Sequence, residues 1–166
     1  MRIKKLIIGI DCFNISQGGG LTHLVSILNE FDKLIQDNLI VIVWGSKSLL
    51  KLLPTFKWLI KENKLLLNKN IFLRFFWHLF LLKNEIKRHN VNVLLCPGGI
   101  CLQKKIPSIN MFRNVLPFLD DELNRYSFYK KLRFKIFRSL TIYSFKKSSG
   151  IIYLSNWSKS FLNSKI

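Results

Sequence analysis

Apolar and polar residues alternate along the chain in two distinct patterns. A mostly apolar run over residues 6–13, with Asp11 near its end, leads to a polar, glycine-rich segment, residues 14–20, which is called the glycine loop below. A short apolar run bounded by turn residues is typical of a buried strand, and apolar residues every three to four positions indicate an amphipathic helix. The helical spacing follows the loop, at Leu21, Leu24, Val25, Leu28 and Phe31. This segment therefore predicts a strand, a loop and a helix over about residues 21–36.

The same alternation continues to the end of the chain. Further strands are predicted at residues 38–44, 58–60, 91–96, 107–112 and 150–154. Helices are predicted at residues 47–53, at 70–89, from the acidic triplet 120–122 onward to 147, and directly after Ser155. Apolar strands that alternate with helices are typical of a parallel sheet covered on both faces. The predicted fold class is α/β, a Rossmann-like, doubly wound parallel sheet in one domain over residues 1–166.

The helix predicted at 70–89 is apolar over most of its circumference. Its polar residues Arg74, His78, Glu85 and Arg88 form one narrow stripe, and we expect His78 simply to lie on that stripe. Such a helix packs against a sheet or a neighbouring helix with most of its surface.

Glycines and small polar residues gather where the predicted strands end. In a doubly wound sheet, ligands bind outside the carboxyl ends of the strands, so these segments predict one shared cleft. Glycine lets a backbone approach a ligand closely, and the free N–H groups of a helix start favour an anion. From the glycine loop alone, a phosphate contact and a plain strand-to-helix turn remain equally open, since neither G-x-G-x-x-G nor a Walker lysine is present. The segments are Gly18 to Gly20, Gly45 with Ser46, Gly98 with Gly99, Arg113 with Asn114, and Ser155.

Composition narrows the class of protein. The chain has 166 residues, of which 49% are hydrophobic, so it can bury a substantial core. Its three cysteines, Cys12, Cys96 and Cys101, are scattered, and its three histidines do not pair with them at ligand spacing. We therefore expect no disulfide framework and no metal site. The longest apolar stretch, residues 71–82, is too short to span a bilayer, and we expect the chain to remain in the cytoplasm.

The high positive charge of the chain indicates that it binds an anionic partner. Lysine and arginine number 27 against nine acids, a net charge of +18, which leaves nucleic acid, anionic membrane and phosphorylated substrates open. The segment 125–147 carries eight of these cations and no acid. Its expected core stripe consists of Tyr126, Tyr129, Leu132, Ile136, Phe137, Leu140 and Tyr143.

The remaining faces of that segment mix cations with Phe128, Phe134, Ile142 and Phe145. Cations interleaved with exposed aromatics suit the headgroup layer of an anionic membrane, which we favour. A solvated face whose aromatics pack on a further domain is the second reading, and stacking on single-stranded nucleic acid is the third. The expected membrane contacts are Lys130, Lys131, Lys135 and Arg138.

Taken in order, these motifs resemble the N-terminal domain of family 4 glycosyltransferases, retaining enzymes with a GT-B fold. Each motif is weak alone, and their order and spacing over almost the whole chain carry the resemblance. The matching stretches are residues 8–11 with 18–24, 41–45, 96–99, 114–118 and 152–159.

The resemblance implies a site at an interdomain cleft. The glycine loop would lie near the diphosphate of a nucleotide-sugar donor, which is a substrate, and no cofactor or metal is implied. Asn114 would lie beside the transferring sugar, where the family often has histidine, as the catalytic candidate. The residues implied for substrate and donor-phosphate binding are Gly18, Gly19, Gly20, His23, Gly98, Gly99, Arg113 and Ser155.

The family's second domain, which binds the sugar nucleotide and carries an E-x7-E motif, has no counterpart in this sequence. We expect the chain to be one half of a GT-B enzyme, as a fragment, a split-gene product or a partner of a separate C-terminal polypeptide, and to be inactive alone. The implied role is the acceptor side of hexosyl transfer in cell-surface polysaccharide or glycolipid synthesis, at the inner face of the membrane, on acceptors that are often lipid-linked. The alternative is a basic α/β module that binds anionic membrane or nucleic acid without catalysis. A Rossmann dehydrogenase or methyltransferase is disfavoured, because Trp44 and Gly45 stand where an acid should end the second strand.

Overall fold

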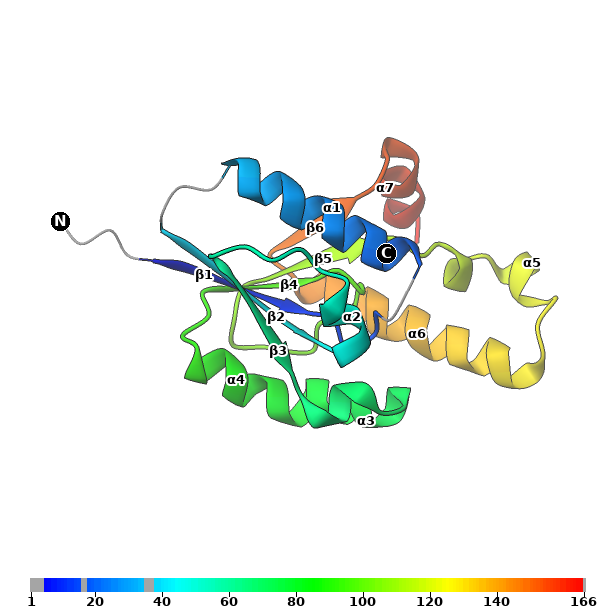
Figure 1. Ribbon diagram of the computed structural model, residues 1–166. Coiled ribbons are helices and arrows are strands. Elements are labelled where there is room, and N and C mark those ends of the chain that lie inside the picture. The colour runs from blue at the N-terminus through cyan, green and yellow to red at the C-terminus, as the bar shows by residue number, and fades with distance from the viewer. Residues whose placement is uncertain (1–4, 16–17, 35–37, 166) are drawn as a thin grey trace.

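The computed structural model describes residues 5–15, 18–34 and 38–165 of the chain. Its six strands form one fully parallel sheet in the order β3-β2-β1-β4-β5-β6, with helices on both faces (Figure 1). The predicted α/β, doubly wound, Rossmann-like class is confirmed. The strands are β1 (Leu6–Asp11), β2 (Leu39–Gly45), β3 (Leu59–Asn63), β4 (Val93–Cys96), β5 (Ser108–Phe112) and β6 (Gly150–Tyr153).

The helices connect these strands by crossovers, as parallel pairing requires. A π-helical turn, η2 (Trp77–Leu81), joins α3 to α4, and short 3-10 turns lie at η1 (Leu65–Asn68) and η3 (Leu116–Phe118). The α-helices are α1 (Gly19–Leu34), α2 (Lys47–Lys51), α3 (Ile71–Phe76), α4 (Leu82–Arg88), α5 (Asp120–Leu123), α6 (Phe128–Lys147) and α7 (Asn156–Asn163).

The strand order reverses between β1 and β4. The chain moves outward from β1 to β2 and β3 on one side, and then continues from β4 to β5 and β6 on the other. At such a switch point the loops after the two neighbouring strands diverge and leave a crevice at the carboxyl edge. The loops concerned follow β1, where residues 12–15 and 18 are described, and β4, at residues 97–107.

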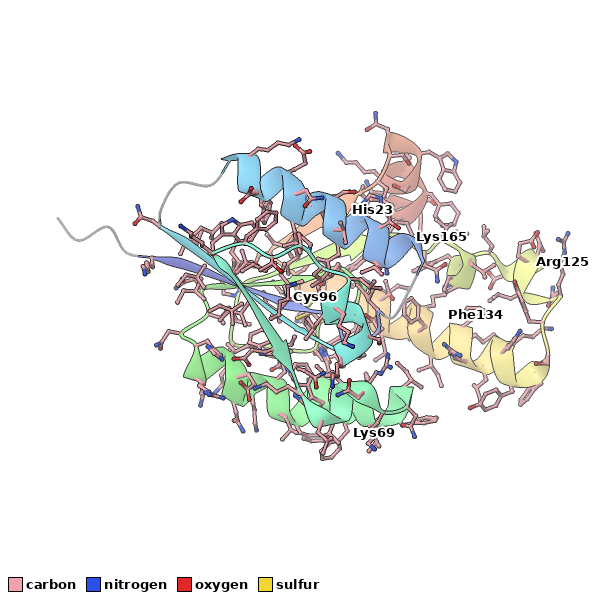
Figure 2. All side chains as sticks on the ribbon, viewed as in Figure 1. His23, Lys69, Cys96, Arg125, Phe134 and Lys165 are labelled. Carbon is pink, nitrogen blue, oxygen red and sulfur yellow. The ribbon has the colours of Figure 1, made fainter. Side chains whose placement is uncertain are left out.

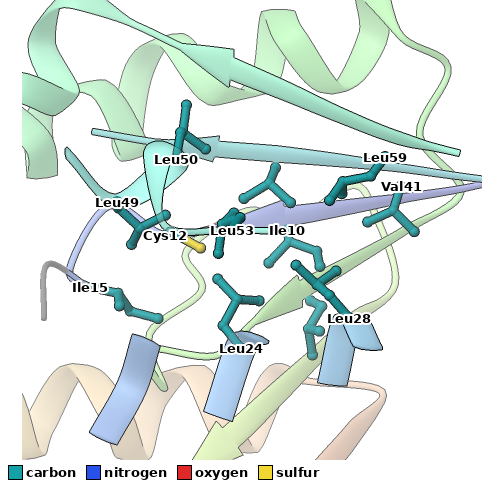
Figure 3. Packing of buried hydrophobic residues seen from close by; sticks show 12 residues of the cluster. Ile10, Cys12, Ile15, Leu24, Leu28, Val41, Leu49, Leu50, Leu53 and Leu59 are labelled. Atoms are coloured by element: carbon teal, nitrogen blue, oxygen red, sulfur yellow. The ribbon is translucent and has the colours of Figure 1, made fainter. Parts of the chain in front are cut away.

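The buried residues of the described chain form three clusters, of which the two larger ones lie on opposite faces of the sheet. On the first face, Ile10 and Val41 of the sheet pack against Leu24 and Leu28 of α1 (Figure 3). On the second face, Trp44 and Leu94 pack against Trp77 and Leu82, and the inner side of α6 joins the same cluster. The helices α3, α4 and α6 therefore cover one face of the sheet together (Figure 1). Cys12, Cys96 and Cys101 are buried and unbridged.

Two predicted boundaries are wrong. The helix expected from 120 to 147 is two helices, α5 and α6, because Ser127 adopts an extended N-cap conformation and restarts the helix. The short strand expected at 58–60 extends through polar residues to Asn63, since the backbone pairs in parallel with β2 up to Gly45. None of the helices within the described residues is both long and apolar enough to cross a bilayer.

Candidate functional site

The glycine loop leads from β1 directly into α1. Gly18 has φ of +71°, a left-handed conformation that favours glycine, and α1 begins at the next residue. Apart from their chain neighbours, none of the described residues lies within 4 Å of where a Cβ on Gly18 or Gly19 would stand, so a ligand can approach this backbone. The first N–H groups of a helix have no partner within it and favour an anion. Ser16 and Gln17 of the predicted loop lie outside the described residues.

Arg113 lies against the start of α1. It follows β5 at the carboxyl edge, and its guanidinium fills the space that a Cβ on Gly20 would need. The side chain is half-buried, and burial lowers its pKa below the usual value of 12.5. Among the described residues, no carboxylate lies within ion-pair distance of it. A cation at the positive end of a helix dipole is unfavourable unless an anion binds beside it.

A pocket of about 200 Å³ opens between the carboxyl edge of the sheet and α6. The Nδ2 group of Asn14 donates a hydrogen bond to the Gly98 carbonyl at 2.9 Å and ties the two switch-point loops together. A Cβ on Gly98 would overlap the Asn14 amide, so close approach requires glycine there. Figure 2 labels Phe134 on the helix that forms the other wall. The polar lining comprises Asn14, Gly98, Gly99, Arg113, Asn114, Arg133 and Thr141.

Three of the five predicted loops meet in this region. Gly98, Gly99, Arg113 and Asn114 line the pocket, and Gly20 lies against Arg113. The Oδ1 atom of Asn114 accepts a hydrogen bond from the Leu116 N–H at 3.2 Å, which leaves its amide Nδ2 for a ligand.

The remaining predicted residues lie elsewhere. His23 is exposed on α1 and does not line the pocket (Figure 2). Ser155 accepts a hydrogen bond from the Ser158 N–H in a capping box, so its hydroxyl starts α7 as predicted. Ser46 likewise accepts from the Leu49 N–H and starts α2. These two serines are helix caps within the structure, and neither lines the pocket.

Sequence reasoning missed several lining residues. Arg133 and Thr141 come from α6, where the charge pattern alone does not show which cations face the sheet edge. Asn14 could have been singled out, because an asparagine directly after a buried strand at a switch point is well placed to bridge two loops. Its Oδ1 atom is buried without a hydrogen-bond partner among the described residues.

The expectation for His78 is wrong. The side chain lies in the π-helical turn and is fully buried, and its Nδ1 atom lies 2.5 Å from Oδ2 of the equally buried Asp11. The Leu102 N–H donates to Nε2 at 3.1 Å, so the proton is on Nδ1 and points to the carboxylate. The Phe13 N–H donates to the other carboxylate oxygen, and the Phe13 ring stacks on the imidazole at 4.4 Å between centroids.

This Asp–His pair has the composition of a catalytic dyad but not its geometry. Both imidazole nitrogens are engaged with protein groups, so neither can accept a proton from a substrate. Asp11 and His78 therefore join the sheet to the α3–α4 helix and act in folding.

A second charged cluster lies where β3 meets α4. The Lys64 ammonium lies 2.8 Å from Glu62 and 2.9 Å from Glu85, and His89 Nε2 lies 2.9 Å from the other Glu62 oxygen. Glu62, Glu85 and His89 have the spacing of metal ligands, but the ammonium lies between the two carboxylates where an ion would bind. Burial acts to raise the pKa of the Glu62 carboxyl, and the hydrogen bond and charge of Lys64 outweigh it, so that this pKa is lowered. The cluster ties an edge strand to a helix.

The faces of α6 differ from the prediction. The expected core residues Tyr129, Leu132 and Ile136 are exposed, whereas Thr141 and Ser144 are buried. Ser144 explains this rotation, because its hydroxyl accepts from the Cys101 N–H and its carbonyl accepts from the Asn110 side chain.

The cations predicted to contact a membrane also differ from one another. Lys130 and Lys135 are exposed, whereas Lys131 donates to Asn124. Arg138 is paired with Asp120 at 3.0 Å.

Comparison with known proteins adds no further information. No protein-family model matches the chain, and neither a curated protein nor a solved structure matches it.

Proposed function

We propose that this chain is the acceptor-side, Rossmann-like half of a nucleotide-sugar-dependent glycosyltransferase. The observation that carries the proposal is the position of Arg113, a half-buried cation without a carboxylate partner in the described chain, against the first turn of α1. A site that combines a guanidinium with helix N–H groups suits a phosphate or diphosphate. The order of the motifs resembles that of family 4 glycosyltransferases, which supports a sugar nucleotide as the molecule that carries this diphosphate.

The chemistry of this half is electrostatic. The departing nucleotide diphosphate gains negative charge as the glycosidic bond to it breaks, and preorganised donors stabilise that charge. Arg113 and the N–H groups of Gly19 and Gly20 would supply such donors. Asn114, at the rim of the same pocket, would orient a hydroxyl of the sugar or acceptor through its amide Nδ2. The groups that bind the nucleotide base and ribose belong to a second domain.

A membrane surface is the second part of the proposal. The exposed lysines of α6, Lys130 and Lys135, together with the exposed rings of Phe128 and Tyr129, suit anionic headgroups. This contact would hold the enzyme at the inner face of a membrane, where a lipid-linked acceptor is delivered.

The alternative function is a basic α/β module that binds anionic membrane or nucleic acid and performs no chemistry. The net charge of +18 favours it, because it exceeds what a single diphosphate site requires. Oligonucleotide affinity that falls steeply with salt, without any effect of sugar nucleotides, would be its signature.

Titration by two-dimensional NMR tests the donor site. UDP-, GDP- and dTDP-sugars and inorganic pyrophosphate are added to the labelled 166-residue chain. We expect weak binding in the millimolar range, with amide shifts concentrated at Gly18, Gly19 and Gly20. Arg113→Gln should abolish these shifts, and Arg88→Gln, an exposed arginine at the other edge of the sheet, should leave them unchanged. Shifts that avoid the start of α1, or that persist in Arg113→Gln, would overturn the assignment.

A further inference from the structure

The α3–α4 helix exposes a row of phenylalanines along its outer side. Phe72, Phe76 and Phe80, called the phenylalanine ridge below, are 73%, 47% and 52% exposed. They are spaced four residues apart, and the ring centroids of Phe76 and Phe80 lie 4.8 Å apart. Residues four apart on a helix lie one above the other, so the ridge is one continuous apolar surface.

The ridge is separate from the core of the protein. The inner side of the same helix already supplies Trp77, His78 and Leu82, which are buried against the sheet. Further apolar side chains are exposed in the same part of the chain, and they are Leu65 of η1 and Ile71, Leu73 and Leu81 of the helix. Apolar exposure on this scale in one place marks a surface that binds something.

Cations border the ridge at both ends. Lys69 precedes α3, at the lower edge of the molecule in Figure 2, and Lys83 and Lys87 follow the ridge along the helix. All three are exposed. The one acid of this helix, Glu85, is turned into the cluster with Lys64 and adds no negative charge to the outer side.

We propose that the phenylalanine ridge inserts into the surface of an anionic membrane. Phenylalanine and leucine would enter the boundary between headgroups and acyl chains, while the bordering lysines would contact lipid phosphates. The ridge deepens the membrane contact proposed above by naming the side chains that enter the bilayer, and it does not depend on sugar transfer.

Charge complementarity and position favour a membrane over a protein partner. The ridge lies on the exposed side of the helix, and none of its residues lines the carboxyl-edge pocket. It lies on the same face of the sheet as α6, whose exposed Phe128, Leu132 and Lys135 would rest on the same membrane (Figure 1). The two helices would form one platform beside the carboxyl-edge pocket.

Vesicle flotation tests the inference. Vesicles of phosphatidylcholine with phosphatidylglycerol are mixed with the 166-residue chain at low salt and at about 0.5 M salt, where charge attraction is strongly screened. The wild type should retain part of its binding at high salt. The triple variant Phe72→Gln, Phe76→Gln and Phe80→Gln should bind at least about tenfold more weakly at high salt, because apolar insertion is lost.

A matched control removes exposed apolar residues elsewhere on the molecule. Trp157, 61% exposed, lies on α7, and Leu154 lies just before that helix, away from the ridge. Leu154→Gln with Trp157→Gln should leave vesicle binding unchanged. A ridge variant that binds vesicles like the wild type would overturn the inference. So would light scattering that shows a wild-type dimer and a monomeric ridge variant, since a second copy would then cover the ridge.

A conservative variant keeps the test valid if the triple variant does not fold. Phe76→Trp, made together with Trp157→Phe, places a tryptophan on the ridge and removes the exposed one of α7. Brominated lipids quench tryptophan fluorescence on contact, so quenching of this variant beyond that of Trp157→Phe alone supports insertion. Equal quenching of the two proteins would contradict it. Sugar nucleotides are omitted throughout, so the outcome is independent of the donor-site titration.

Discussion

The buried contact between Asp11 and His78 gives the sharpest test of how this fold is stabilised. We expect His78→Leu, a change of similar volume, to destabilise the protein strongly. It leaves the Asp11 carboxylate buried with only the Phe13 N–H as a donor, and it removes the acceptor of the Leu102 N–H. His23→Leu is the matched control, since His23 is exposed.

The magnitude follows mainly from the Asp11 carboxylate, because the Leu102 N–H is only part-buried. Leaving a buried charge without its partner costs about 3–5 kcal/mol. We therefore expect His78→Leu to lower the free energy of unfolding by about 3–5 kcal/mol. For a chain of this length the midpoint of thermal unfolding would fall by about 6–20 °C. His23→Leu should change the free energy by less than about 0.5 kcal/mol.

A second substitution separates the charge of Asp11 from its shape. Asp11→Asn in the wild type leaves one acceptor oxygen for two donors, the Nδ1 proton of His78 and the Phe13 N–H, and should destabilise the protein. In the His78→Leu background the same change replaces an unpaired buried carboxylate by a neutral amide, and it should restore stability. Urea unfolding of the four proteins at neutral pH provides the measurement. A loss below about 1 kcal/mol for His78→Leu, or an effect of Asp11→Asn with the same sign in both backgrounds, would refute this reasoning.

Three further predictions concern the charged cluster, the glycine loop and catalysis. The Lys64 ammonium lowers the pKa of Glu62 below its usual value of 4.5. The stability that this pair contributes is therefore present above pH 4.5 and lost as the pH falls through the lowered pKa. In Lys64→Met, the free energy of unfolding, measured from neutral to acid pH, should fall less steeply than in the wild type. Gly20→Ala should displace the flexible Arg113 head and weaken pyrophosphate binding with little change in stability, whereas Gly18→Ala should cost about 1–2 kcal/mol because of its positive φ. The 166-residue chain alone should neither bind UDP-, GDP- or dTDP-sugars at micromolar concentration in calorimetry nor transfer sugar, because a few exposed amides contribute only about 0.5–1.5 kcal/mol each. Measurable turnover would show that the proposed second domain is not needed.

The sequence predicts the sheet well because its central strands are buried on both faces. The run at β2 (Leu39–Gly45) is apolar throughout, and such a run has few alternatives to a central parallel strand. The edge strand β3 was predicted too short, since its last residues, Lys61 to Asn63, are polar and pair only through backbone and side-chain hydrogen bonds. Helical periodicity also failed on α6, where Ser144 is buried by hydrogen bonds that no apolar pattern encodes.

The sequence indicates the position of the candidate site through its backbone features, but it does not show which side chains contact one another there. Glycines and Arg113 at strand ends mark the carboxyl edge, because topology brings those ends together. The roles of Asn14 and His78 depend on partners 84 and 67 residues away along the chain, and no local pattern shows which loop will face them. One signal was present, since a carboxylate such as Asp11 at the end of a buried strand requires a partner.

The buried Asp11–His78 contact also fixes the rotation of the α3–α4 helix about its own axis. Between Ile71 and Leu82 the helix is apolar on nearly every side, so hydrophobicity alone would let it roll on the sheet among several rotations of similar energy. A hydrogen bond from the imidazole to the carboxylate exists in one rotation only, and the wide π-helical turn lets Trp77 and His78 face inward together. A single buried polar pair of this kind can select one packing among many. The Asp11–His78 pair thereby determines which aromatic side chains of the helix are buried in the core. Phe72, Phe76 and Phe80 remain on the surface.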